Sequence, residues 1–293
     1  MIHYHGGPIT PETCALRAWR RGHAFISWAS HGQIKLAASV CESFAIDNGA
    51  FSIWKRDQTS RPDWDAYYDF CEEWLAHPAC DWAVIPDVIG GTEEENDALL
   101  SEWPHSHAGV PVWHLNESPE RLVRIAQSWP RIALGSAAEF DVSRPSLCLG
   151  RLASVLPLIC NSDGRPVVKL HGLRMLRPQI VSKVPLSSAD STNIARNVGI
   201  DKRWRGPYAP ATNEARTDVI RERIEMVQAP DRMTDAPEDL HRLAKEHLLA
   251  GEVASKYDAG GAVDLEKALE GSIARGREAQ REAGLRLDGP EVA

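Results

Sequence analysis

Short apolar runs recur through the first two thirds of the chain, and each ends at a polar or glycine-containing cluster. The runs are rich in Val, Ile, Phe and Trp, which is typical of strands buried on both faces of a parallel sheet. The pattern predicts strands at residues 2–7, 24–30, 44–49, 82–87, 110–116, 131–136, 167–172 and 184–190.

Helix-like segments separate several of these runs. They are found at residues 10–22, 63–78, 92–103 and 118–129. The last three open with Asp63, Thr92 and Ser118, residue types whose side chains cap helix amino termini. Alternating strands and helices indicate parallel βα units.

The spacing of the strands favours a closed barrel over an open doubly wound sheet. Residues 1–205 are therefore predicted to form a (β/α)8 TIM barrel, an α/β fold. Neither the GxGxxG nor the GxxxxGK[ST] motif is present, so dinucleotide and P-loop chemistry are not expected. From residue 206 the pattern changes to amphipathic segments broken by Pro and Gly, which predicts a helical carboxyl-terminal extension over 206–293.

Composition and charge narrow the class of protein. The chain is 43% hydrophobic and 25% charged, as soluble globular proteins are. It has no apolar stretch of bilayer length and no signal-peptide pattern, so a cytoplasmic location without membrane contact is expected. The net charge of −8 gives no overall attraction to nucleic acid. A local basic patch would be required, and Lys202, Arg203 and Arg205 form the strongest one.

Polar side chains and glycines stand at most predicted strand ends. In a barrel, the carboxyl ends of the strands carry the active site. Each residue alone has an ordinary structural explanation, such as a cap or a core histidine, but the recurrence predicts a site. The residues are His3, His5, Ser30, His31, Asp47, Asn48, Asp87, His114, Asn116, Gly135, Ser136, His171, Gly172 and Asp190.

Two of the carboxylates suggest a reaction. Asp47 and Asp190, at the third and eighth strands, are placed to face each other across a barrel mouth. Such a pair supports substitution at a sugar anomeric carbon, where one carboxylate attacks and the other moves protons. Asp87 would then accept hydrogen bonds from a bound base, and Gly135 with Ser136 would allow a flat ligand to approach closely.

Several short motifs resemble those of a known family. IDNGAF (46–51), PDV (86–88), IALGSA (132–137), LHG (170–172) and ADSTNIARN (189–197) are similar, in this order, to motifs of the tRNA-guanine transglycosylases. The likeness is greater to the relatives that insert 7-deazaguanine bases into phage or bacterial DNA. The resemblance extends over most of the predicted barrel.

The resemblance implies a role for each matching residue. Asp190 would be the nucleophile and Asp47 the second catalytic aspartate. The residues implied to bind substrate are Asn48, Phe51 for base stacking, Asp87 for base recognition, His114 near the base-reading position, Gly135 and Ser136 in the base pocket, His171 at a base-sandwiching position and Arg196 as a phosphate contact.

One departure from the family favours DNA as the polymer. The tRNA enzymes carry a cysteine-rich zinc site after the nucleophile, whereas this chain has no cysteine beyond Cys160. The resemblance thus implies replacement of guanine in DNA by a 7-deazaguanine base of the preQ0 type, through a covalent Asp190-linked deoxyribosyl intermediate. No metal or cofactor is expected. The partners would be the free base and DNA with a flipped or single-stranded guanine, in the host cytoplasm if a phage encodes the protein. Whether the protein forms a homodimer or requires a partner subunit stays open.

Three alternatives remain open. The same site would serve a tRNA-guanine transglycosylase. A metal-dependent amidohydrolase would use His3, His5, His114 and Asp190 as metal ligands. A barrel without catalytic activity would act as a DNA-binding subunit.

Overall fold

The computed structural model describes residues 1–58, 62–137, 140–199 and 209–233. Within these residues, nine strands form one parallel sheet in the order β5-β4-β3-β2-β1-β9-β8-β7-β6. The strands are β1 (Ile2–Gly6), β2 (His23–Ser27), β3 (Ser43–Asp47), β4 (Cys80–Val84), β5 (Gly109–Val110), β6 (Val112–His114), β7 (Arg131–Gly135), β8 (Lys169–Gly172) and β9 (Ser188–Ser191). Each predicted strand has a counterpart, with the fifth divided into β5 and β6. The second strand ends at Ser27, before a 3-10 turn at Trp28–Ser30, and the last begins at Ser188 instead of residue 184.

The division of the fifth strand brings the two ends of the sheet together. β5 pairs with β4, whereas β6 pairs with β7, and only Pro111 separates them. Proline has no N–H for a sheet ladder, which interrupts the strand there. The backbone N–H of Ala133 in β7 still donates to the Pro111 oxygen at 2.9 Å. The sheet is therefore nearly closed and barrel-like, compatible with the predicted (β/α)8 arrangement.

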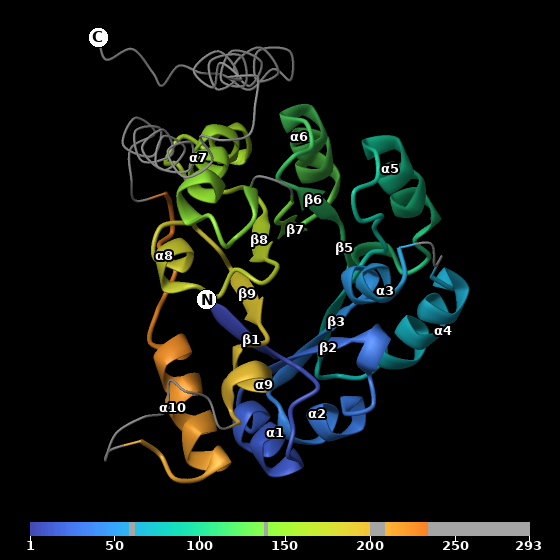
Figure 1. Cartoon of the computed structure of the whole chain (residues 1–293). Coiled ribbons are helices and arrows are strands. Elements are labelled where there is room, and N and C mark those ends of the chain that lie inside the picture. The colour runs from blue at the N-terminus through green and yellow to red at the C-terminus, as the bar shows by residue number, and fades with distance from the viewer. Residues whose placement is uncertain (59–61, 138–139, 200–208, 234–293) are drawn as a thin grey trace, which may run out of the picture.

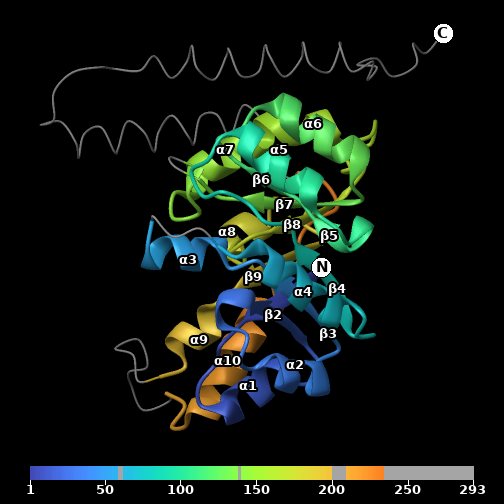
Figure 2. The same ribbon diagram turned by 90° about the vertical axis from the view of Figure 1, so that its right-hand side faces the viewer.

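Helices cover the outside of this sheet (Figures 1 and 2). They are α1 (Glu12–Trp19), α2 (Ile34–Val40), α3 (Ala50–Arg56), α4 (Trp64–Leu75), α5 (Glu93–Glu102), α6 (Pro119–Ser128), α7 (Pro145–Val155), α8 (Pro178–Val181), α9 (Asn193–Asn197) and α10 (Asn213–Glu225). The four helices predicted between strands correspond to α1, α4, α5 and α6. Their predicted caps are also confirmed, because the side chains of Asp63, Thr92 and Ser118 accept hydrogen bonds from first-turn amides.

Aromatic and apolar side chains fill the barrel interior. Tyr4, Phe25 and Trp82 are buried there, and the rings of Tyr4 and Trp82 meet edge to face with centroids 5.7 Å apart. Since alternate strand residues point to opposite faces, the inward Tyr4 turns His3 and His5 outward. A packed interior leaves only the ends of the barrel for a site.

Helix α10 packs against the outside of the barrel beside α1. Arg17 of α1 pairs with Asp218 of α10 at 2.8 Å, and His5 Nε2 lies 3.0 Å from Glu225 Oε1. The expected domain boundary at residue 205 and the basic patch around it lie outside the described residues, as do the helices expected beyond residue 233. Over the described ranges, no helix combines the length and the apolar character needed to cross a bilayer.

Candidate active site

The mouth of the barrel lies at the carboxyl ends of the strands, where α3, α8 and α9 follow β3, β8 and β9 (left in Figure 2). Asp190 of β9 is in register with Tyr4, whose side chain points inward, and it is only 3% exposed. Asp47 of β3 is in register with Ser27, two residues after the inward Phe25 of β2. The alternation of the strands therefore turns both predicted catalytic carboxylates into the mouth.

The environment of Asp47 differs from that of an ordinary surface carboxyl. Burial raises the pKa of Asp47 to about 6, the neighbouring Ser27 hydroxyl opposes this, and the negative charges of Asp190 and Asp87 add to the increase. The positive charge of Arg174 lowers the pKa of Asp47. Asp190 at the end of β9 and Asp87 in the loop after β4 are thus close enough to affect the pKa of Asp47, as a ring of strand ends predicts.

The carboxylate of Asp190 is held by the loop that follows β8. The backbone N–H of Arg174 donates to Asp190 Oδ1 at 2.7 Å. Arg174 has a φ of 58°, in the left-handed region that residues other than glycine rarely adopt. Such conformations concentrate at functional sites, where the surrounding structure holds them in place. Here the conformation aims a main-chain donor at the predicted nucleophile.

The side chain of Arg174 covers the predicted base-stacking residue. Its guanidinium carbon lies 4.0 Å from the centre of the Phe51 ring, and Phe51 in α3 is 37% exposed at the rim. This is a cation–π contact between the loops after β3 and β8. A base that stacks on this face of Phe51 must displace the guanidinium.

Asn48, Asp87 and His114 form a buried, hydrogen-bonded group beside the aspartates. Asn48 Nδ2 donates to Asp87 Oδ1 at 2.7 Å, and His114 Nε2 lies 2.9 Å from Asp87 Oδ2. The exposure of these residues is 9% or less. Each oxygen of Asp87 therefore has a fixed partner, and the orientation of the carboxylate is set. The structure brings these three predicted residues together.

The group continues into an ion-pair network that was not predicted. Glu117 Oε1 lies 3.2 Å from His114 Nδ1, and Glu117 Oε2 accepts from Arg121 Nη1 at 2.6 Å. Arg121 is 1% exposed and also donates to Asp97 at 2.8 Å. The signal available in the sequence was the spacing of His114, Glu117 and Arg121 by three and four residues.

His114 is expected to stay protonated at neutral pH. Burial alone lowers its pKa, but the hydrogen bonds and charges of Asp87 and Glu117 outweigh that and raise it to about 9. Because this value exceeds that of an unfolded histidine, the stabilisation is complete below about pH 6.5 and is lost as the pH rises through about 9. NMR titration of the His114 ring should give this midpoint. Asp87→Asn should lower it, and an unchanged midpoint in that variant would contradict the assignment.

Arg121→Leu is expected to lower the free energy of unfolding by about 3–5 kcal/mol, because it leaves the buried Glu117 carboxylate with His114 as its remaining cation and removes the donor to the Val112 oxygen. Urea unfolding measures the change. Arg124 supplies a matched control on the same helix, since it binds Asp97 at 2.5 Å but its side chain is 57% exposed. Arg124→Leu should cost less than about 1 kcal/mol. Equal losses of unfolding free energy in the two variants would show that a buried ion pair contributes no more to stability than an exposed one.

The other predicted site residues have varied surroundings. A Cβ on Gly135 would lie 2.9 Å from His114 Cδ2, so this glycine makes room for the imidazole. Ser136 follows β7 and is partly buried. Arg196 is exposed on α9. Predicted contacts of Ser136 and Arg196 with substrate stay predictions.

His171 lies inside the barrel beneath Asp190. It is fully buried, its ring centroid is 4.7 Å from that of Trp82, and its Nδ1 is 2.9 Å from the Ser188 hydroxyl. Burial lowers the pKa of His171, so the ring is neutral at physiological pH. Its Nε2 lies 3.5 Å from Asp190 Oδ1 and has no hydrogen-bond partner among the described residues. The His171 ring therefore packs directly beneath Asp190, at the bottom of the candidate site.

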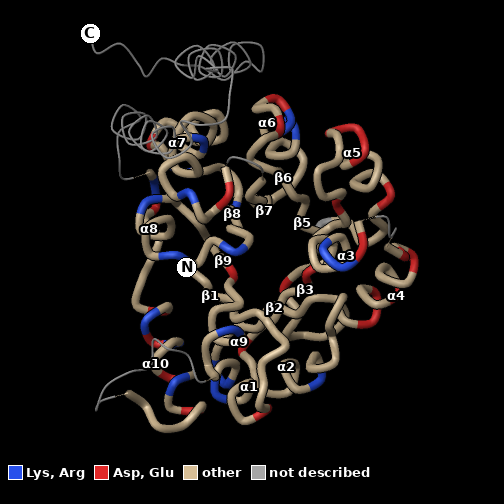
Figure 3. Tube along the Cα trace, viewed as in Figure 1, with Lys and Arg blue, Asp and Glu red and all other residues tan. Residues whose placement is uncertain are grey.

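Charged side chains are distributed unevenly around the mouth (Figure 3). Basic residues stand near α8 and α9 on one side of the mouth, whereas Lys55 and Arg56 end α3 on the other side, next to α4 and α5. Acidic residues gather in the first turn of α5, at Glu93, Glu94 and Glu95. A polyanion would approach the mouth from the side of α8 and α9.

His3 and His5 do not belong to the mouth. His3 Nε2 lies 2.7 Å from the Val227 oxygen, and His5 Nε2 contacts Glu225, both on the outer face of the sheet. The ligand set of the amidohydrolase alternative is therefore not brought together. Within the described ranges, no three His, Cys, Asp or Glu side chains are grouped as metal ligands.

No family model matches the chain, and no match was found among curated proteins or solved structures. The likeness to the transglycosylases rests on the motifs alone.

Proposed function

We propose that this chain is a (β/α)8-barrel transglycosylase that replaces guanine in DNA with a 7-deazaguanine base of the preQ0 type. The observation that carries the proposal is the pair of inward carboxylates, Asp47 and Asp190, in different environments. Asp190 accepts a main-chain hydrogen bond, whereas the pKa of Asp47 is raised to about 6. Such a difference suits one nucleophile and one acid or base.

In the first step, Asp190 attacks C1′ of a deoxyguanosine. The C1′–N9 bond breaks, its electron pair goes to the leaving guanine, and Asp47 in its protonated form supplies the proton that the guanine takes up. The product is a covalent ester between C1′ and Asp190. Since Arg174 holds Oδ1 of Asp190, we assign the attack to Oδ2.

In the second step, the incoming 7-deazaguanine base restores the glycosidic bond. Its N9–H gives a proton to Asp47, N9 attacks C1′, and the bond to Asp190 breaks with its electron pair returning to the carboxylate. Two displacements give net retention at C1′, and Asp47 is protonated again for the next cycle. Water must be excluded throughout, because it would convert the ester to an abasic site.

We assign selection of the base to Asp87 in both steps. Guanine and its 7-deaza analogues share an edge with N–H donors, and a carboxylate accepts such donors with the lone pairs that its fixed partners leave. Asn48 and His114 set the orientation of those lone pairs. Because a base stacked in a duplex cannot reach carboxylates inside the barrel mouth, the target base must be flipped out or presented in a single strand.

Nucleoside analysis of DNA and tRNA tests this proposal. Cells that express the protein with a supply of 7-deazaguanine should contain the modified base in DNA, and cells without the supply should not. Cells expressing Asp190→Ala at equal levels serve as the control and should lack it. Modified tRNA with unmodified DNA would assign the tRNA as substrate. Modification that persists in the Asp190→Ala cells would contradict the catalytic role, as expected for a binding subunit.

A further inference from the structure

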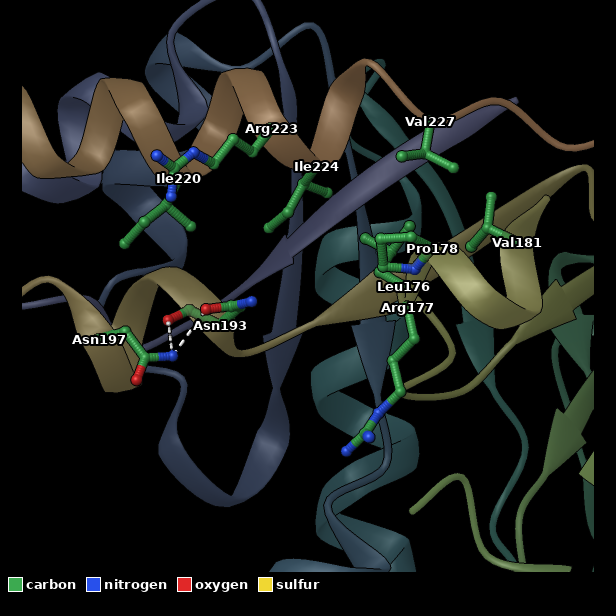
Figure 4. Close-up of a pocket in the computed structure, with 10 residues that line it drawn as sticks. All are labelled: Leu176, Arg177, Pro178, Val181, Asn193, Asn197, Ile220, Arg223, Ile224 and Val227. Atoms are coloured by element: carbon green, nitrogen blue, oxygen red, sulfur yellow. Dashed lines mark hydrogen bonds between the residues drawn. The ribbon is translucent and has the colours of Figure 1, made fainter. Parts of the chain in front are cut away.

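A pocket of about 260 Å³ lies outside the barrel wall, between α8, α9 and α10 (Figure 4). It arises because the helices over this part of the sheet are short. α8 spans Pro178–Val181 and α9 spans Asn193–Asn197, so neither fills the space beneath α10. The pocket is distinct from the carboxylate site, which faces the barrel interior.

The walls of the pocket are apolar on two sides. Ile220 and Ile224 of α10 point toward α9 and toward Leu176, in the loop before α8 (Figure 4). At the α9 edge stands the Asn193 side chain, whose carbonyl oxygen accepts from Asn197 Nδ2 at 2.6 Å. The combination of apolar walls and an amide at one edge suits a flat ring with polar atoms on its rim.

Two exposed arginines, Arg177 and Arg223, stand at the edges of the pocket, and neither makes an ion pair within the described part of the chain. The charge of Arg177 helps to lower the pKa of Asp141, and its side chain extends away from α10 (Figure 4). Other arginines of α10 are engaged, since Arg216 donates to four oxygens and Arg221 pairs with Glu225 at 2.8 Å. Cations left beside an apolar pocket favour an anionic ligand with an apolar ring.

The pocket adjoins the predicted nucleophile through the backbone. The N–H of Leu176 donates to the Asp190 carbonyl oxygen at 3.3 Å, and the N–H of Asn193 donates to the Ser191 hydroxyl at 3.0 Å. Two lining residues thus flank Asp190 in space. Because Leu176 and Asn193 follow the carboxyl ends of β8 and β9, the pocket lies at the mouth end of the barrel wall, on its outer side. A strand whose sugar is attacked by Asp190 would reach the pocket by crossing the rim between these two loops.

We propose that the pocket binds the nucleotide next to the exchanged guanosine in a DNA strand, with its base between Ile224 and Leu176 and its phosphates near Arg177 and Arg223. This inference rests on the proposed function, because it takes DNA as the polymer. Base contacts with apolar side chains and phosphate contacts with arginine are the usual components of single-strand binding. A free nucleotide has the same chemistry, and the experiment separates the two sources.

Fluorescence anisotropy with a labelled single-stranded oligonucleotide containing one guanine tests the proposal. Each flanking base is replaced in turn by an abasic unit. For the wild-type protein, one flanking position should weaken binding about tenfold, equivalent to about 1.4 kcal/mol. In Ile224→Trp, which fills the pocket, the same abasic unit should have no further effect. An equal abasic penalty in both proteins would overturn the proposal.

Charge variants give a second readout that does not depend on filling the pocket. Arg177→Gln and Arg223→Gln should each weaken binding of the intact oligonucleotide and reduce its salt dependence by about one phosphate contact. The matched control is Lys35→Gln on α2, an exposed lysine far from the pocket in sequence and carrying the same charge change. Arginine variants that bind like the control would contradict the proposal. Circular dichroism melting checks that every variant folds.

Calorimetry with dAMP and dGMP separates the free nucleotide from the strand. Binding of a mononucleotide that is lost in Ile224→Trp, with no abasic effect in any oligonucleotide, would assign the pocket to a free nucleotide and overturn the strand proposal. Failure of the wild-type protein to bind the oligonucleotide would also overturn the strand proposal. Loss of the abasic effect in Ile224→Trp without base exchange in the wild type would retain the pocket and reject the proposed reaction.

Discussion

Asp190→Ala should reduce the rate of base exchange by about 1,000-fold or more, because it removes the attacking carboxylate, whereas Asp47 moves the proton and Asp87 is held by Asn48 and His114. The release of labelled guanine from DNA measures the rate. A denaturing gel measures the covalent protein–DNA species, which should be present for the wild type when incoming base is withheld and absent for the variant.

Two control variants show whether the loss of base exchange arises from misfolding. Asp190→Asn keeps an oxygen that can accept the Arg174 N–H bond, so it should fold normally and still form no adduct. Asp218→Ala removes an exposed carboxylate that pairs with Arg17 and should retain full exchange. An adduct in Asp190→Asn would mean that another residue is the nucleophile.

Asp47→Asn should make the protein more stable at neutral pH by about 1–3 kcal/mol, while base exchange falls about 100- to 10,000-fold. The pKa of this carboxyl is raised from 3.8 to about 6 in the folded protein. Between these pH values the folded state holds the proton and the unfolded state has lost it. Stability from this group is thus present at low pH and is lost as the pH rises through about 6. Asparagine cannot ionise, so the variant avoids the free-energy cost of burying the charged carboxylate.

Urea unfolding of wild type and variant at pH 5 and pH 8 measures the stability change, which should be larger at pH 8. Asp218→Asn is the control and should show no such pH dependence. If Asp47 gives its proton to the leaving guanine, adduct formation by the wild type should slow about tenfold per pH unit above pH 6. A flat profile between pH 6 and pH 8 would remove Asp47 from that role.

The strands were the most predictable part of the fold. Their runs of β-branched and aromatic residues differ from the surrounding sequence, and the polar residues that end them mark the barrel mouth. Asp47, Asp87 and His114 could be assigned to that mouth for this reason. The helices α2, α3, α7, α8 and α9 were missed. Helix α7 is apolar on most sides, and the other four are too short for a helical period to appear.

Other features depend on side-chain direction or on backbone conformation. The alternation in HYH shows that His3 and His5 share a face, but only the packing of Tyr4 among Phe25 and Trp82 shows that this face is the outer one. The left-handed conformation of Arg174 has no sequence signature, because a residue other than glycine adopts it only where tertiary contacts impose it. The spacing of Glu117 and Arg121 by four residues permits an ion pair, but its burial beside His114 follows only from the fold.

The pairing of β1 with β9 has a consequence for how the chain folds during synthesis. His3 is paired with Ala189, so β1 lacks one of its two neighbours during synthesis until β9 follows. Contacts this far apart in sequence make folding slow, and they leave strand edges open to other chains in the meantime. Overexpression is therefore expected to favour aggregation of nascent chains, and slower translation at low temperature should increase the yield of folded protein.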